Sequence, residues 1–275
     1  MTVMGSSRAL ALSVVQREQG RRAATSAILI DIKQRDTSMG KGSVTPARSI
    51  IRDWLLVALS FSTGVYDAIC FLFFGKVFTA FQTGNIVFLG LAFGGIRPPA
   101  GPNLVYVVIS LGGFIVGGAL AMRILRKSRP QTHTEGKDTL WSSRVSVTLA
   151  AGLALQIIFL VVWMTTSRST EMIYIMVATG AMSMGMQMNA IESLQVQGVS
   201  TTALTVTVGL LGAVATRSLT LPAARRMIGG IMGVTFGAFL GSLMLSHANL
   251  YAPLVPVLVT TLVIAIASRT LIPRR

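Results

Sequence analysis

One carboxylate lies inside the first long apolar run of the chain. Asp67 stands in residues 54–74, which read WLLVALSFSTGVYDAICFLFF. A charged side chain at the centre of a membrane helix costs roughly 2.5 kcal/mol or more on insertion scales, so it normally faces a partner or a water-filled cavity. Asp67 therefore has two interpretations. It binds a cation or relays a proton, or it is a packing carboxylate satisfied by Tyr66, Ser62 or a neighbouring helix.

A second polar cluster follows within 20 residues. Gln82, Thr83, Gly84 and Asn85 fall in the next apolar run, residues 77–95. Glycine lets the backbone turn or approach closely, and threonine hydroxyls and asparagine amides can replace the water around a solute. The alternative is a helix break that is capped by its own side chains. Together with Asp67, the cluster predicts a path or a binding site for a small solute.

Two further polar sets lie in the second half of the chain. Gln187 and Asn189 stand in GMQMNAIESL, where they either oppose Asp67 or form hydrogen bonds between helices. Thr205 and Thr207 stand in the short apolar run 202–216. We expect these four side chains to line the same path.

The sequence offers little for catalysis. It has one cysteine, Cys70, and two histidines, His133 and His247, which are far apart. Cys70 alone can form neither an intrachain disulfide nor a cysteine-built metal site. Zinc-protease, nucleophile-elbow, Walker and dinucleotide-binding motifs are all absent from the sequence. A membrane enzyme would need acid–base groups that converge inside the spans. We therefore expect no enzymatic activity, no metal and no cofactor.

Composition assigns the chain to the membrane. Hydrophobic residues make up 52%, charged residues 12%, and the mean hydropathy is +0.68. The net charge of +15 comes mostly from an N-terminal tail and a few loops beside apolar runs. That distribution is typical of residues that meet anionic lipid on one side of a bilayer, and it argues against nucleic acid as a partner.

The tail, residues 1–53, carries nine Lys/Arg and four Asp/Glu. We interpret it as a basic, disordered cytosolic segment ahead of a transmembrane domain at 54–270. A mitochondrial transit peptide is the alternative, but such peptides are poor in acids. The transit-peptide alternative is weakened by three acidic residues in the tail, Glu18, Asp31 and Asp36.

The number of spans follows from length and charge. Apolar runs fall near 54–74, 77–95, 104–122, 145–166, 172–190, 202–216, 228–246 and 250–268. A full helix needs about 20 apolar residues. The run 77–95 has polar residues inside it, and 202–216 is short. If all eight runs cross the membrane, 17 Lys/Arg lie inside and 7 lie outside. If the runs 77–95 and 202–216 instead enter and leave on the same side, 21 Lys/Arg lie inside and 3 lie outside.

The positive-inside rule favours the second arrangement. The sequence thus predicts an all-α, polytopic membrane helix bundle with about six full transmembrane helices and two broken or re-entrant segments. We expect the plasma membrane as its location, with both termini cytoplasmic.

The two odd segments match each other. Shifting the chain by 122 residues places 68–90 on 190–212, with eight of 23 positions identical. Under the six-span topology the halves, about 54–122 and 172–246, run in opposite directions. An inverted repeat with a broken helix in each half is a recurring transporter design. The alternative is a duplicated scaffold with no transport role.

Glycines spaced four residues apart predict close helix packing. They are Gly113 and Gly117 in the first half, and Gly229, Gly233, Gly237 and Gly241 in the second. The same faces could serve assembly into a homo-oligomer.

The motif residues resemble a known family. The pattern Gly64-x-x-Asp67-Ala68-x-x-Phe71, then Gly75-x-x-Phe78, then Thr83-Gly84-Asn85, is similar to the YoaK-like family of integral membrane proteins, a domain of unknown function numbered 1275. Gly185-x-Gln187 and Thr201-Thr202-x-x-Thr205 resemble its second half. The likeness covers about residues 50–270 and implies about six spans. The family has no established activity, so the resemblance supplies no substrate.

These observations predict a small secondary transporter or permease for a small polar or cationic solute or an ion. The alternative function is a non-transporting membrane scaffold or regulatory protein. A scaffold would have a closed, dry interior and an Asp67 isolated from solvent.

Overall fold

The protein is described by a computed structural model that covers residues 46–95, 101–126, 140–166, 169–196, 208–209 and 221–272. Every regular element in these ranges is a helix, which confirms the all-α prediction. The elements are α2 (Pro46–Phe73), α3 (Gln82–Phe93), α4 (Leu104–Arg126), α5 (Ser143–Thr165), α6 (Thr170–Glu192), α8 (Leu221–His247), the 3-10 turn η1 (Asn249–Tyr251) and α9 (Leu254–Thr270).

Six of these helices are long, and each overlaps one of the six predicted full spans. Five of the six regions are long and apolar enough to cross a membrane: α2, α4, α5, α8 and the stretch Asn249–Thr270 that holds α9. Helix α6 has 23 residues, the same length as α4 and α5, but it carries more polar residues and methionines. Its polar positions are tolerated because α6 packs between α4 and α5 and buries much of its surface. A polytopic membrane helix bundle is confirmed.

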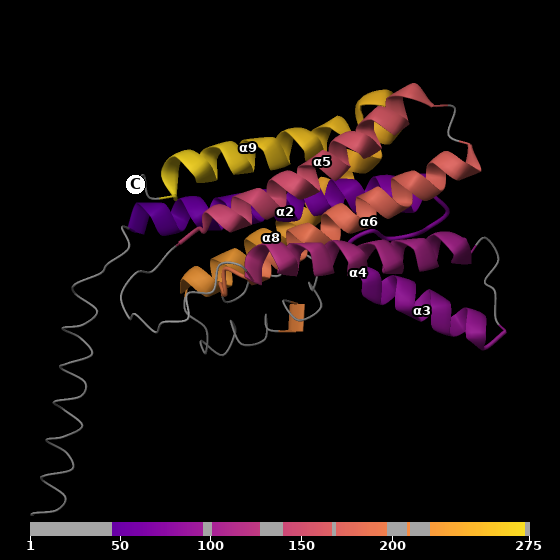
Figure 1. Cartoon of the computed structure of the whole chain (residues 1–275), viewed down its shortest axis with the longest axis horizontal. Helices are drawn as coiled ribbons and strands as arrows, with labels where there is room; N and C mark the ends of the chain where they lie inside the picture. The colour runs from indigo at the N-terminus through magenta and orange to yellow at the C-terminus, as the bar shows by residue number, and fades with distance from the viewer. Residues whose placement is uncertain are drawn as a thin grey trace, which may run out of the picture. The chain divides into compact units, whose positions relative to one another are not determined.

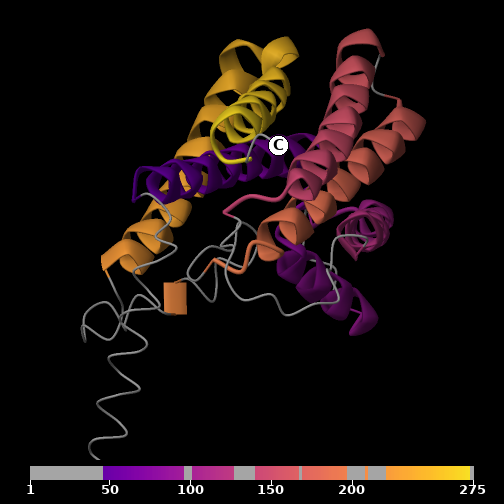
Figure 2. The same ribbon diagram turned by 60° about the vertical axis from the view of Figure 1, so that its left-hand side comes forward.

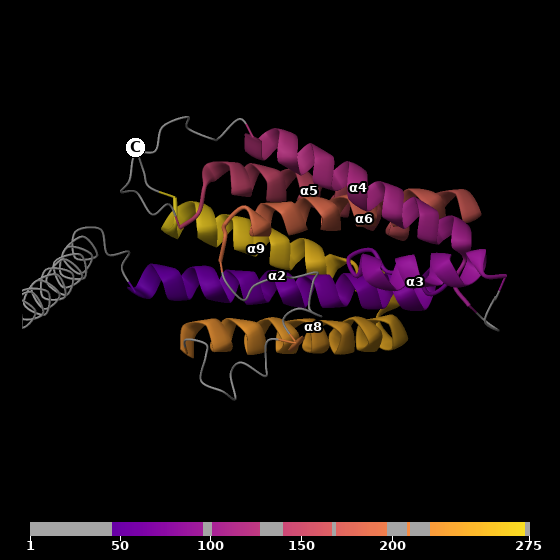
Figure 3. The same cartoon turned by 90° about the horizontal axis from the view of Figure 1, so that it is seen from below.

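The long helices alternate in direction. Helices α2, α5 and α8 run one way along the bundle, and α4, α6 and α9 run the other way (Figures 1 and 3). The start of α2 and the end of α9 therefore lie at one end of the bundle. That end of the bundle also holds the last turns of α4 and α6 and the first turns of α5 and α8. This is the arrangement that the six-span prediction requires.

The first predicted broken segment is broken in the structure. Helix α2 ends in a Schellman motif, in which Lys76 N–H donates to Phe71 O at 3.0 Å. Gly75 and Lys76 both have positive φ, at 70° and 63°. Residues 74–81 are not helical, and α3 then has only 12 residues, about 18 Å at 1.5 Å per residue. Helix α3 is too short to cross a bilayer, so the eight-span alternative is wrong for this run.

The second predicted broken segment, 202–216, lies outside the described residues except for 208–209. Helix α2 runs antiparallel to α6, and α4 runs antiparallel to α8 (Figures 1 and 3), which is compatible with inverted halves. Since the matching break is not described, the inverted repeat stays a prediction.

Glycines sit where two helix pairs approach most closely. A Cβ on Gly233 or Gly241 would come 2.9 Å from the carbonyl oxygens of Val57 and Val65 on α2, and one on Gly237 would meet Phe61 O. Helices α2 and α8 are drawn side by side in Figure 3. On the other side, a Cβ on Gly113 would come 2.9 Å from Ala178 O of α6.

The remaining predicted packing glycines lie on the same two contacts. Gly229 faces the Val57 side chain, and Gly117 faces the backbone of Met182 on α6. These glycine faces are therefore used between helices of one chain, and a homo-oligomer stays a prediction.

We predict that Gly237→Ala destabilises the protein by about 2 kcal/mol or more, because the added methyl group meets backbone that cannot move aside alone. The measurement is thermal unfolding of the purified variant in detergent. Gly112→Ala on α4 is the control, since a Cβ there meets nothing within 4 Å. Equal stability of both variants would contradict the close α2–α8 contact.

The topology predicts which cysteines share a side of the membrane. In a Cys70→Ala background, cysteines at Ser193 and Ser268 should react with an impermeant maleimide from one side, and a cysteine at Gly101 from the other. An eight-span chain would instead place 193 opposite 268. Labelling intact cells and inverted vesicles distinguishes the two outcomes.

Candidate functional site

Asp67 holds the broken segment together. Its Oδ1 accepts hydrogen bonds from Thr79 N at 2.7 Å, from Thr79 Oγ1 at 2.7 Å and from Ala80 N at 2.9 Å. Its Oδ2 accepts from Phe81 N at 3.0 Å. The side chain is 3% exposed. The carboxylate thus sits against the N-terminus of α3, where free N–H groups and the helix dipole favour a negative charge.

Asn85 pairs with the same segment from the other side. Its Oδ1 accepts from Phe78 N at 3.1 Å, and its Nδ2 donates to Phe78 O at 2.7 Å. Ser110 of α4 also donates to Phe78 O, at 2.6 Å. Gln82 Nε2 donates to Thr79 O at 2.8 Å and to Ser110 Oγ at 3.1 Å. We call Asp67, Thr79, Gln82, Asn85 and Ser110 the clamp.

The two other residues of the predicted cluster do not join the clamp. Thr83 is exposed and lies on the outer face of α3 with Ile86 and Val87. Gly84 packs under Phe78, where a Cβ would come 2.9 Å from the phenyl ring. Gly84 therefore makes room for the break and offers no side chain to a solute.

The clamp gives the carboxylate of Asp67 partners that neither interpretation named. The described partners of its carboxylate are backbone N–H groups and one hydroxyl of the break, in place of Tyr66, Ser62 or a neighbouring helix. Both oxygens are occupied by donors. In this conformation Asp67 is a positioning group for the backbone, and a cation would have to displace those donors.

A second set of polar atoms lies deeper in the bundle. Six buried side-chain oxygens have no hydrogen-bond partner within the described part of the chain. They belong to Ser62, Tyr66, Gln156, Ser183, Gln187 and Thr260. Their side chains are at most 2% exposed. A buried polar atom left unpaired costs about 1–3 kcal/mol, so such a concentration requires an explanation.

Five of these six residues lie where α2, α5 and α6 meet. The Tyr66 ring packs on Phe159 with centroids 4.9 Å apart, and a Cβ on Gly180 would come 2.9 Å from that Tyr66 ring. One turn along, a Cβ on Gly152 would lie 3.5 Å from Ser183 Oγ. Gln156 lies on the buried face of α5 between Gly152 and Phe159.

Ser62 precedes Tyr66 by one turn of α2, so it lies on the same side of that helix. Gln187 reaches α2 as well, where its Nε2 donates to Thr63 Oγ1 at 2.9 Å, while its Oε1 stays unpaired. We call Ser62, Tyr66, Gln156, Ser183 and Gln187 the polar layer. Gln156 and Ser183 both lie near the middle of 23-residue helices, which puts the layer at mid-depth.

Sequence reasoning found only part of the layer. Gln187 was predicted to line the path, and it contacts Thr63, one turn away from Asp67. Asn189 is half-buried and donates to Gly185 O of its own helix at 2.9 Å, so it does not face Asp67. Gln156 and Ser183 were missed. The signal that could have found them is a glutamine or serine on the glycine-bearing face of a predicted span.

Thr205 and Thr207 lie outside the described residues. Among the described residues, groups of three or more His, Cys, Asp or Glu that could hold a metal ion are absent.

Comparison with known proteins identifies one family. A family model described as "Protein of unknown function (DUF1275)" matches residues 55–267. The chain is 35% identical over 160 residues to the "UPF0700 transmembrane protein YoaK" of Bacillus subtilis (strain 168). That alignment covers 58% of this chain and 65% of the relative, slightly less than two thirds of the relative's length. No solved structure matches the chain.

We predict that Asp67→Asn lowers the free energy of unfolding by about 3 kcal/mol, because the amide nitrogen faces a backbone donor and cannot accept from it. Thermal unfolding in detergent measures the loss. Asp53→Asn on the same helix is the matched control. Asp53 is 22% exposed in its ion pair with Arg226, so about 1 kcal/mol or less is expected there. A larger loss in the control would contradict the clamp.

Proposed function

Because the chain belongs to the DUF1275 family of proteins of unknown function, and is a multi-pass integral membrane protein, we propose that it is a small permease whose solute passes through the polar layer. The single observation that carries this proposal is the set of unpaired oxygens in the middle of the bundle. Hydrocarbon offers no hydrogen bonds, so a membrane protein normally pairs its polar atoms internally. Water or a solute would supply the missing partners.

The chemistry of the layer favours a neutral solute. Ser62, Tyr66 and Ser183 contribute hydroxyls, which donate or accept, and the two glutamines contribute amide oxygens, which only accept. The layer itself includes no charged side chain. A small molecule with several hydroxyl or amide N–H donors fits these groups better than a metal ion or an organic cation.

The clamp has a separate role in this proposal. Hydrogen bonds to groups on α2 and α4 fix the break in place, and broken helices of this kind are common in transporters. Asp67 then determines where α3 begins and leaves solute binding to the polar layer.

We also propose that the end of the bundle with the start of α2 and the end of α9 is cytoplasmic, in the plasma membrane. Eight of the nine described Lys/Arg stand near the helix ends that meet there, and Lys76 follows the opposite end of α2. Such asymmetry is typical of the cytoplasmic side.

A scaffold is the second candidate, and one observation favours it. Asp67 is 3% exposed with both oxygens bonded, as expected for a closed interior. Serine and threonine hydroxyls in helices can also bond to the carbonyl four residues earlier, as Ser60 and Thr63 do. The Tyr66 hydroxyl and the amide oxygens of Gln156 and Gln187 cannot form this bond to their own helix.

Permeation is tested with reconstituted vesicles. We expect vesicles that contain the protein to equilibrate glycerol or urea faster than empty vesicles in stopped-flow light scattering. Gln156→Leu should abolish most of the difference, because it removes a polar group of the layer at similar volume. Thr235→Val is the control, since Thr235 is exposed on α8 and bonds only to its own helix.

Access of water to the layer gives an independent readout. In a Cys70→Ala background, a cysteine at Ser183 should react with a small water-soluble maleimide, and one at the buried apolar Val177 should not. Unreactive Ser183→Cys together with vesicles no faster than empty ones would favour the scaffold.

A further inference from the structure

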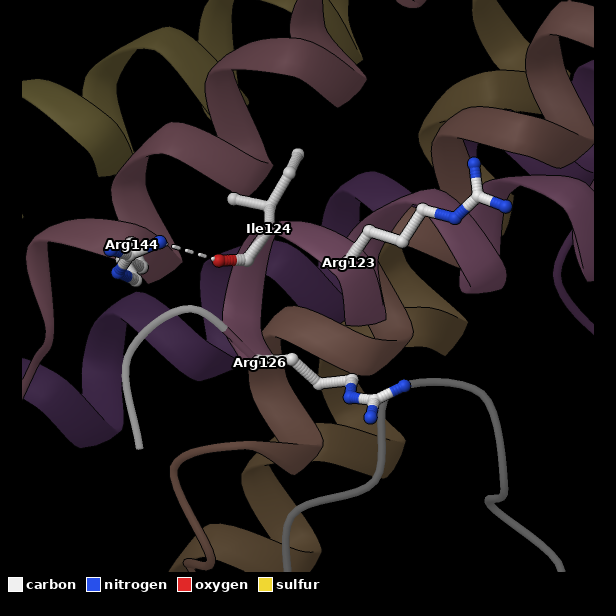
Figure 4. A pocket seen from close by; sticks show the side chains of 4 residues that line it. All are labelled: Arg123, Ile124, Arg126 and Arg144. Carbon is white, nitrogen blue, oxygen red and sulfur yellow. Dashed lines mark hydrogen bonds between the residues drawn. The ribbon is translucent and has the colours of Figure 1, made fainter. Parts of the chain in front are cut away.

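A group of arginines surrounds a shallow depression where α4 ends and α5 begins. The depression is lined by Arg123, Ile124, Arg126 and Arg144, and we call it the arginine depression. Figure 4 shows the three arginine side chains around Ile124, with Arg144 on one side and Arg123 and Arg126 on the other. The permease proposal does not use these residues.

The backbone fixes the positions of these charges. Arg144 Nη1 donates to Ile124 O at 2.9 Å, which ties the first turn of α5 to the last turn of α4 (Figure 4). This bond uses one of the five N–H donors of the guanidinium group. Arg123 and Arg126 are three residues apart in the last turn of α4, so they leave the helix on neighbouring positions.

The depression carries an uncompensated positive charge within the described ranges. No described carboxylate forms an ion pair with its three arginines. Asp53 pairs elsewhere, with Arg226 at 3.2 Å. Glu192, at the end of α6, is exposed and is not in an ion pair with these arginines. In Figure 4 the three guanidinium groups lie on different sides of Ile124 and point away from one another, so each keeps N–H donors for an anion. Guanidinium groups match the oxygens of phosphate particularly well.

The surroundings favour a lipid as the source of the phosphate. Apolar side chains on the same two helices are exposed next to the depression: Leu120 is 37% exposed, Met122 53% and Val147 54%. Both helices are long and apolar enough to cross a bilayer. The arginines thus lie at the level where headgroups meet hydrocarbon, with a surface for acyl chains beside them. Soluble phosphate would use the arginines and leave that apolar surface without a role.

We propose that the arginine depression binds the phosphate of an anionic phospholipid. The side chains of Arg123 and Arg126 turn toward the phosphate and donate to it, while Arg144 holds the helix junction and adds positive charge, and the acyl chains lie along Met122 and Val147. This site gives the general attraction of basic loops for anionic lipid a defined position. It depends on the fold and not on the permease activity.

The experiment measures thermal unfolding of the full-length protein in detergent with added phosphatidylglycerol, phosphatidylcholine or inorganic phosphate. Phosphatidylglycerol should raise the unfolding temperature more than the other two. In the double variant Arg123→Gln/Arg126→Gln, the phosphatidylglycerol concentration needed for half of the shift should rise by roughly tenfold or more. Arg144 is kept, because it also supports the helix junction.

The control is the double variant Arg225→Gln/Arg269→Gln, which removes the same charge from exposed positions at the same end of the bundle. It should keep the response to phosphatidylglycerol. An equal loss in both double variants would overturn the site in favour of general surface attraction. An equal response of the native protein to inorganic phosphate would overturn lipid as the source. If Arg123→Gln/Arg126→Gln is too unstable to purify, the single variants Arg126→Gln and Arg225→Gln are compared. Native mass spectrometry then measures how much phosphatidylglycerol each variant retains after extraction from nanodiscs.

Discussion

The structure depends on pairing the backbone of a helix break that lies among membrane helices. Between α2 and α3 the chain leaves helical geometry, and its N–H and C=O groups lose their usual partners. Each unpaired backbone group in hydrocarbon costs several kcal/mol. Asp67 pairs three N–H groups and one hydroxyl, and Asn85 pairs both polar groups of Phe78. The cost of burying one carboxylate is offset because its hydrogen bonds also remove the cost of several unpaired N–H groups.

Close helix packing makes such a break tolerable. Glycines on α8 bring that helix against the backbone of α2, and glycines on α4 do the same for α6. The α2–α8 contact covers the face of α2 opposite the one that Gln187 contacts, which leaves a second face for α5 and α6. The polar layer lies along that second face. In Figure 2, α8 (orange) lies on the left of the bundle, and α5 and α6 (pink to salmon) lie on the right. The glycine contacts therefore occupy the outer faces of α2 and α6 and leave their other faces to the polar layer.

Different tasks are thus separated along the bundle. The clamp positions the backbone near one end, the polar layer offers hydrogen bonds at mid-depth, and the arginine depression carries positive charge at the other end. Asp67 suggested a cation site in the sequence because a carboxylate inside an apolar run is costly to bury. Its donors compensate that charge within the chain, which is why the solute that we propose is neutral.

The sequence by itself determined the membrane class, the long helices and the broken run at 77–95, because span length, hydropathy and charge asymmetry are local properties of composition. It also indicated that Asp67 and Asn85 have a special role, because polar groups in apolar runs are costly. Only the tertiary structure decided that these two groups hold the break, that Thr83 faces outward, and that Gln156 and Ser183 face the centre. The physical reason is that a hydrogen-bond partner is chosen by helix packing. Residues such as Ser62 and Gln156 are separated by more than ninety positions in the chain, and no local pattern specifies that they meet.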